Sequence, residues 1–318
     1  MKLNKTILCL LFGIASLNVQ AQAPSKVIIT GSRFTYPLVE KWISEFSKEY
    51  PDIPFHIIAR GGNNTDSANL VINAHKLRPE EIKPGYYTVF IGRYALLPFT
   101  NAKNPLVTQW QKKGLKEKEL KKLYFAKYDP YAPEESEKEK EKKKNQYAPV
   151  IYTRAQKACA PITFSANYGY TQEDILGKPI GGDDKHLVTA VERDTNGISY
   201  NNLNLLYDTQ TRKIKNNLSI IPLDINENGK LDPNENFYGT VDEVIAKLES
   251  DKNTKIPVEY LNILYSTQAI ENNKSLGLFL DWVFSKGQQF NHELGFLNFE
   301  PEVLIKQKEI FVASQNKQ

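Results

Sequence analysis

Hydrophobic and polar residues alternate in blocks at the beginning of the chain. A short apolar run at residues 27–29 ends in the polar triplet 30–32, and a second apolar run begins at Phe55. Between them, Pro51 ends a stretch whose apolar residues have helical spacing. These residues are Leu38, Trp42, Ile43 and Phe46. The order predicts a strand, a loop, a helix and a second strand.

The alternation continues to the end of the chain. Apolar runs predict strands at 87–91 (extended through 99), 150–152 and 219–223. Helical spacing predicts helices at 65–77, 116–125, 172–176, 240–250 and 276–284, with a loop at 163–170 and further core elements at 187–191 and 198–207. Thr240 and Glu243 match a capping box at the start of the 240–250 helix. Strands that alternate with helices predict the α/β class.

The first 21 residues have the features of a secretory signal. Lys2 and Lys5 precede an apolar stretch at 7–17, and the small-residue site Val19-Gln20-Ala21 follows it. The stretch is too short to span a bilayer. We therefore expect export to the periplasm or beyond, and no membrane insertion after the signal is removed. A buried N-terminal strand is the alternative.

Length, charge and cysteine content narrow the class of protein. A chain of 318 residues can form two domains with real cores. Removing Lys2 and Lys5 from 41 basic residues leaves 39 against 37 acidic ones, a balance that argues against binding to nucleic acid or membranes. Beyond the signal, Cys159 is the remaining cysteine, so no internal disulfide is expected. Its alanine neighbours indicate a small buried side chain rather than a nucleophile.

Residues 129–147 interrupt the pattern with charged residues, prolines and polar residues. Because the charges nearly cancel, a solvated insertion loop or an exposed helix explains this segment better than a docking patch.

The most specific motif lies between residues 224 and 235. It fits the twelve-residue calcium loop D-x-[DN]-x-[DN]-G-x5-E at every defined position. Oxygen ligands surround a hard cation at fixed positions of such a loop. The predicted ligands are Asp224, Asn226, Asn228, Lys230 (through its carbonyl), Asp232 and Glu235.

The loop has no entering helix, because the apolar run 219–223 before it reads as a strand. We therefore predict a single structural Ca²⁺ site rather than a paired sensor. A turn-rich hairpin tip that merely uses Asn, Asp and Gly is the alternative.

Polar residues that could bind an anion follow the first predicted strand. Ser32 and Thr35 offer hydroxyl donors beside a helix start, and Gly31 lets the backbone approach a ligand closely. Arg33 could add charge-assisted hydrogen bonds. Ordinary capping by Ser32, with Arg33 exposed, explains the same residues equally well.

Two further loops follow strands in the same way. The segment 60–67 supplies the candidates Arg60, Gly62, Asn63, Thr65 and Asp66, and the loop after 150–152 supplies Arg154. A capped polar connection and a surface salt bridge are the respective alternatives. Since ligands bind beyond the carboxyl ends of strands in open α/β sheets, we expect the three loops to converge on one cleft.

At these residues the chain resembles the phosphate-binding proteins of ABC importers. GSRFTYPLVEKWISEF resembles their G-S-[ST]-x-x-x-P-L segment, and VFIGRYALLPFTNAKNPL resembles their strand and asparagine-proline segment. ERDTNGISYNNL and the terminal FLDWVFSKGQQFNHELGF resemble later segments, in the family's order. The third loop departs from the family, with Ala158-Cys159-Ala160 in place of Ser-Gly-Thr. Asp66 is the remaining candidate for the aspartate that accepts a proton from hydrogen phosphate.

The resemblance implies a two-lobed type II periplasmic-binding-protein fold with two crossover strands. It implies lobe 1 at residues 22–92 and 262–318, and lobe 2 at 93–261. It further implies capture of phosphate or a related small oxyanion for an ABC permease. The calcium loop and the charged insertion are additions to the family pattern.

Two other function classes are alternatives to solute binding. An interaction protein on the same scaffold, with a degenerate cleft and a structural cation, is the alternative. A hydrolase is not indicated, because neither H-E-x-x-H nor G-x-S-x-G occurs. The dense polar cluster 181–186 reads as a capped loop rather than a general-base site.

Overall fold

The computed structural model describes residues 25–59, 67–125 and 148–315. The predicted signal at 1–21 and the charged insertion at 129–147 lie outside these residues.

Within the described residues, nine strands form a mixed sheet in the order β2-β1-β3-β9-β4-β7-β5-β6, with β8 beside β4. The strands are β1 (Val27–Gly31), β2 (Phe55–Ala59), β3 (Leu70–Asn73), β4 (Tyr86–Asn101), β5 (Val150–Arg154), β6 (Lys178–Ile180), β7 (Gly197–Asn202), β8 (Leu218–Ile220) and β9 (Val258–Ser266). The α-helices are α1 (Tyr36–Phe46), α2 (Val107–Lys113), α3 (Glu117–Tyr124), α5 (Cys159–Asn167), α6 (Asp184–Arg193), α7 (Leu203–Leu206), α8 (Val241–Ser250), α9 (Thr267–Asn272), α10 (Lys274–Ser285) and α11 (Pro301–Gln315).

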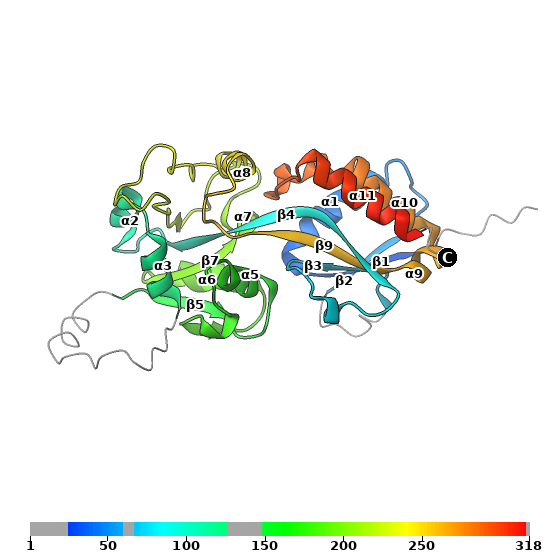
Figure 1. Ribbon diagram of the computed structural model, residues 1–318. Helices are drawn as coiled ribbons and strands as arrows, with labels where there is room; N and C mark the ends of the chain where they lie inside the picture. Colours follow the sequence, from blue (N-terminus) through cyan, green and yellow to red (C-terminus); the bar gives the residue numbers. More distant parts are fainter. Residues whose placement is uncertain (1–24, 60–66, 126–147, 316–318) are drawn as a thin grey trace, which may run out of the picture.

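Two strands run between the two lobes of the molecule (Figure 1). The first half of β4 pairs with β9, from Tyr86 opposite Ser266 to Ala95 opposite Val258. The second half of β4 pairs with β7 and β8 of the other lobe. This arrangement confirms the predicted α/β fold of the type II periplasmic-binding-protein kind, with two crossover strands. The predicted lobe boundaries fall at Gly92/Arg93 and Leu261/Asn262, inside these strands, and stay a prediction.

The long strand β4 is buried because its sequence is apolar on both faces. From Ile91 to Asn101 every residue is buried. A strand covered on both faces needs a nearly continuous apolar run rather than an alternating one. The predicted strand at 87–99 is therefore confirmed, and it begins one residue earlier and ends two residues later.

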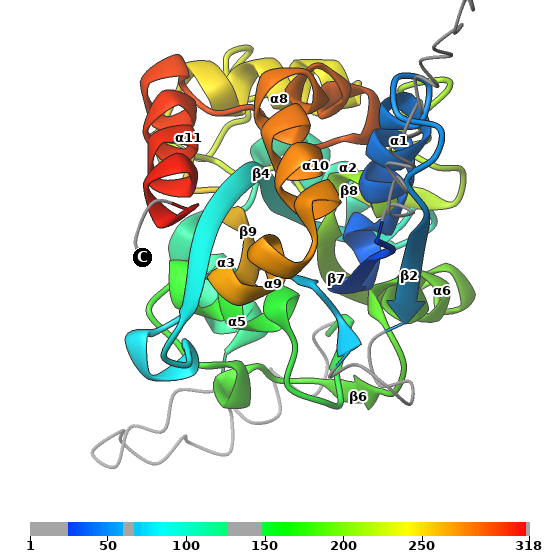
Figure 2. The same ribbon diagram turned by 90° about the vertical axis from the view of Figure 1, so that its right-hand side faces the viewer.

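Three helices cover one face of the sheet in the lobe that holds β1. Helices α1, α10 and α11 lie side by side over that sheet (Figures 1 and 2). Helix α1 buries Leu38, Trp42 and Phe46, as its helical spacing predicts. The Trp42 indole Nε1 donates to the backbone oxygen of Gly287 at 2.8 Å, so its polar atom is satisfied inside the core.

Three predicted elements are wrong. The segment 70–73 is not a helix but β3, which pairs in parallel with β1. Leu70 and Ile72 are buried there, so the position between two other strands decides the conformation. Most of the predicted loop at 163–170 belongs to helix α5, and the predicted helix at 172–176 shrinks to a 3₁₀ turn, Gln172–Asp174. Helix α5 buries Thr163 and Ser165, polar residues that hid its helical pattern.

Candidate functional site

Segments from both lobes line a cavity of about 480 Å³. One wall follows β1, in the lobe of β1. The opposite wall combines the segment between β5 and α5 with the β6–α6 connection. The lining residues are Gly31, Ser32, Arg33, Phe34, Arg154, Gln156, Lys157, Ala158, Cys159, Gly182, Asp183 and Asp184. We refer to this cavity as the interlobe cleft.

Of the residues predicted to bind an anion, Gly31, Ser32, Arg33 and Arg154 line the interlobe cleft. Thr35 does not line it, because its hydroxyl is buried and donates to the Ser32 carbonyl at 2.6 Å. The remaining five lie outside the described residues: Arg60, Gly62, Asn63, Thr65 and Asp66.

Gly31 has a different role from the one its position in the loop predicts. Its φ is +143°, and an added Cβ would lie 2.1 Å from the backbone oxygen of Ile72. The close approach that Gly31 permits within the chain is therefore to β3. The next residue continues the contact, since the Ser32 N–H donates to the same Ile72 oxygen at 2.9 Å.

Arg154 reaches into the cleft from the end of β5. Its Nη1 donates to Asp184 Oδ1 at 2.5 Å, and its Nη2 donates to the Gly182 carbonyl. Its Nε is buried and has no hydrogen-bond partner in the described part of the chain. Burial raises the pKa of Asp184, and the charge and hydrogen bond of Arg154 only partly oppose this rise. One guanidinium donor is therefore left without a partner among the described residues.

The second arginine of the cleft, Arg33, forms an ion pair with a residue of the opposite lobe. Arg33 Nη1 lies 3.5 Å from Asp183 Oδ2, and the arginine side chain is 46% exposed. With Lys157, the lining contains three cationic side chains against the two carboxylates of Asp183 and Asp184. The cleft therefore carries a local positive excess, although the chain as a whole is nearly balanced.

Sequence reasoning missed Asp183 and Asp184 as cleft residues. It identified the segment 181–186 as a capped loop, and Asp183 is indeed the N-cap residue of α6. The capping pattern shows that these carboxylates begin a helix. It cannot show that the helix begins opposite Ser32 and Arg33.

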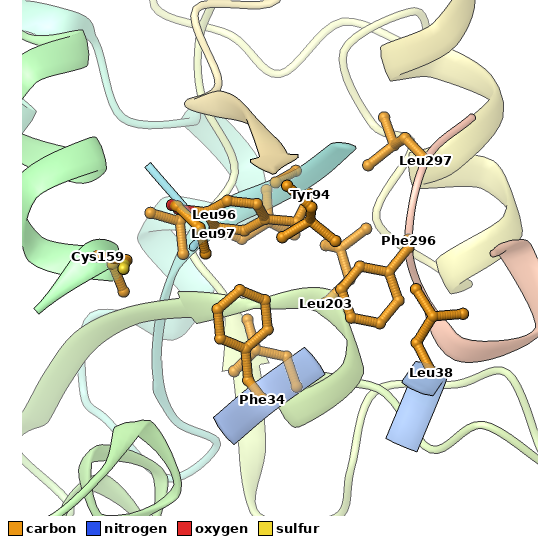
Figure 3. Close-up of a cluster of buried hydrophobic side chains, with 14 of the residues drawn as sticks. Phe34, Leu38, Tyr94, Leu96, Leu97, Cys159, Leu203, Phe296 and Leu297 are labelled. Carbon is orange, nitrogen blue, oxygen red and sulfur yellow. The ribbon is translucent and has the colours of Figure 1, made fainter. Parts of the chain in front are cut away.

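Cys159 was also missed as a cleft residue. It is buried, as its alanine neighbours predict, but it lies at the margin of the apolar cluster, on α5 (Figure 3). Its Sγ is 3.1 Å from His75 Nδ1 and 3.4 Å from Ser32 Oγ. Burial raises the pKa of the Cys159 thiol, but the hydrogen bond and charge of His75, with Ser32 and the Ala74 backbone, outweigh burial and lower it overall.

The predicted calcium loop folds back on itself through hydrogen bonds. The Asp224 carboxylate accepts from the N–H groups of Asn228 at 3.1 Å and Gly229 at 2.7 Å. Asp232 Oδ2 accepts from the side-chain amides of Asn226 and Asn228, which lower the pKa of Asp232. Glycine at position 229 meets a backbone requirement, because its φ is +83°.

Across residues 25–59, 67–125 and 148–315, no three His, Cys, Asp or Glu side chains gather closely enough to hold a metal ion. The Ca²⁺ site of the loop therefore stays a prediction that rests on its sequence motif.

None of the helices in the described part of the chain combines the length and the apolar character needed to cross a bilayer.

Comparison with known proteins supports the fold. No protein-family model and no curated protein matches the chain. Solved structures do match it at low identity. A candidate phosphate ABC transporter substrate-binding protein from Clostridium perfringens, solved with bound phosphate, has a TM-score of 0.61 and 18% identity, over 87% of this chain and 100% of the other. An ABC-type phosphate transport receptor from Vibrio cholerae has a TM-score of 0.54 and 13% identity, over 86% and 100%.

A third structure, described as a candidate phosphate-binding protein from Planctomyces limnophilus, has a TM-score of 0.51 and 12% identity, over 92% of this chain and 99% of the other. At identities this low, the structural similarity supports a shared fold alone. The ligand has to be inferred from the residues of the site itself.

Proposed function

We propose that this protein is an exported solute-binding protein that captures phosphate, or a related small oxyanion, in the interlobe cleft. It would deliver the anion to an ABC permease. The observation that carries this proposal is the buried Arg154 Nε, a charged donor without a partner among the described residues. An unpaired buried donor is costly, and an oxyanion in the cleft would satisfy it.

The other groups of the cleft fit the same guest. Ser32 supplies a hydroxyl, and Arg33 and Lys157 add positive charge at the rim. Closure of two lobes around a ligand is a common way to surround an anion with donors from both sides. The phosphate bound in the Clostridium perfringens structure and the description of the Vibrio cholerae protein as a phosphate transport receptor support phosphate as the first anion to test.

The two carboxylates on the cleft wall restrict which oxyanion fits. Asp183 and Asp184 repel a fully ionised anion but can accept a hydrogen bond from a protonated one. Hydrogen phosphate carries such a proton at neutral pH, and sulfate does not. We therefore expect the cleft to prefer phosphate over sulfate.

Calorimetric titration of the purified, ligand-free chain tests this function. We expect saturable binding of one phosphate per chain, and sulfate binding weaker by at least tenfold, about 1.4 kcal/mol. Arsenate is a matched control, because it has the shape and protonation of phosphate and should bind comparably. Absence of phosphate binding, or equal affinity for sulfate, would refute the proposal.

An interaction protein on the same scaffold is the second candidate function. A specific observation favours it: Arg33 and Arg154 already pair with Asp183 and Asp184, so internal carboxylates occupy part of the anion site. On this proposal the cleft is degenerate, and no oxyanion binds in the titration above.

We also propose that the loop 224–235 binds a structural Ca²⁺ ion. The complete motif and the burial of the Asp224 and Glu235 carboxylates support it. At a free Ca²⁺ concentration ten times the Kd, binding should stabilise the fold by about 1.4 kcal/mol. Thermal unfolding in Ca²⁺ and in chelator measures this shift. Glu235→Gln should abolish it and Asp242→Asn, outside the loop, should keep it. Equal melting temperatures with and without Ca²⁺ would contradict the site.

A further inference from the structure

Three polar side chains from three separate segments meet beside the interlobe cleft, and two of them, Ser32 and Cys159, line it. Cys159 begins α5, His75 follows β3, and Ser32 follows β1. The sulfur of Cys159 is within hydrogen-bond distance of both His75 Nδ1 and Ser32 Oγ. A thiol next to an imidazole is the arrangement that activates a cysteine nucleophile.

The surroundings of the sulfur favour the thiolate. Burial alone would raise the pKa of Cys159, but the adjacent His75 and Ser32 lower it below the ordinary value. Cys159 is the first residue of the nine-residue helix α5, where the helix dipole favours negative charge. Tyr94 of β4 also faces the thiol, but burial raises the pKa of Tyr94, so it stays a neutral neighbour.

The sulfur is also within reach of small molecules. Cys159 is 7% exposed, yet it lines the same cavity as Arg33, Arg154 and Lys157. These cationic side chains attract an anionic reagent to the position where the thiol lies. The chain has two cysteines, and the other is Cys9 in the predicted signal, so the mature chain has no second thiol to resolve an adduct.

We propose that Cys159 is a site of reversible covalent modification, at which it forms a mixed disulfide with a small anionic disulfide. His75 Nδ1 takes the thiol proton, and the thiolate sulfur attacks one sulfur of the disulfide. A new S–S bond forms as the old one breaks, and the leaving thiolate departs with its electron pair. An external thiol reverses the step. The adduct occupies the cleft, and it can also form in a chain whose cleft binds no phosphate.

The reaction can be followed with 5,5′-dithiobis(2-nitrobenzoate), a disulfide that carries carboxylates and releases a coloured thiolate. The Cys9→Ser chain leaves Cys159 as the single thiol. We expect one equivalent of coloured thiolate, a matching adduct by mass spectrometry, and no reaction of Cys9→Ser/Cys159→Ser. At pH 6 the folded chain should react faster than the same chain unfolded in urea, because only the folded chain holds the thiol beside His75.

Variants of the histidines test the role of His75. His75→Gln in the Cys9→Ser background should slow the reaction at neutral pH by about tenfold, since the thiolate fraction falls. His56→Gln, on the exposed side of β2, is the matched control and should react at the unchanged rate. A folded Cys9→Ser chain that fails to react, or that reacts no faster than the unfolded chain, would overturn the proposal. The folded-against-unfolded comparison decides the matter even if His75→Gln does not fold.

Discussion

Replacing Arg154 by glutamine should weaken phosphate binding by about a hundredfold, or roughly 3 kcal/mol, because charge-assisted hydrogen bonds are lost from a buried site. Arg154 lines the cleft with a formal charge and a buried Nε that has no partner in the described part of the chain. Glutamine keeps much of the volume of the side chain and removes its charge. The effect should therefore appear in the affinity rather than in the overall shape of the cleft.

The single substitution has a second effect that must be separated from the first. It leaves the Asp184 carboxylate, whose side chain is only 12% exposed, without its cation. An uncompensated buried charge destabilises a fold by about 3–5 kcal/mol. The informative comparison is therefore between Asp184→Asn and Arg154→Gln/Asp184→Asn, in which neither chain contains the unpaired carboxylate.

Calorimetry on these two chains, with thermal unfolding to show that both are folded, measures the contribution of Arg154. Arg193→Gln, at the exposed end of α6, is the matched control and should bind phosphate as the unaltered chain does. If the two Asp184→Asn chains bind phosphate equally well, Arg154 is not part of the anion site.

Replacing Gly31 by alanine should destabilise the protein by about 3 kcal/mol, because the site tolerates neither the conformation nor the volume of a side chain. The φ of +143° is strained for any residue with a Cβ, and that Cβ would overlap the Ile72 oxygen. Relieving the overlap requires β1 and β3 to move apart. The Ser32 N–H would then lose its bond to the same oxygen.

Urea unfolding monitored by tryptophan fluorescence measures this change in the free energy of unfolding. Gly181→Ala is the matched control: no atom lies within 4 Å of its added Cβ, and its φ is not in the left-handed region. It should change stability by less than about 0.5 kcal/mol. A Gly31→Ala chain as stable as this control would show that β1 and β3 are packed less closely than the structure indicates.

The elements that were predicted well are those whose signal is local. The α1 helix follows from apolar residues at helical spacing, and α8 follows from its cap, where Thr240 Oγ1 accepts from the Glu243 N–H at 3.2 Å. The wrong predictions share a different cause. The segment 70–73 forms a strand because β1 and β9 lie on either side of it. Such pairing depends on residues far away in the sequence.

The candidate site also combines residues that a local sequence pattern predicts with residues that only the tertiary structure brings together. The polar residues after β1 and β5 are visible in the sequence, and the structure brings Ser32, Arg33 and Arg154 to one cavity. The carboxylates of Asp183 and Asp184, which pair with those arginines, read as an ordinary helix cap. They line the cleft because the β6–α6 connection packs close to the segments that follow β1 and β5.

By itself, the sequence determined the α/β class, the long buried strand β4 and the polar loops that follow strands. Apolar periodicity and helix caps act over a few residues, so they can be read directly from the chain. Only the tertiary structure decided which side chains share the cleft. Cys159 lies 84 positions from His75 in the sequence, yet their polar atoms are 3.1 Å apart. That contact exists because two crossover strands hold the lobes face to face, and no local pattern encodes it.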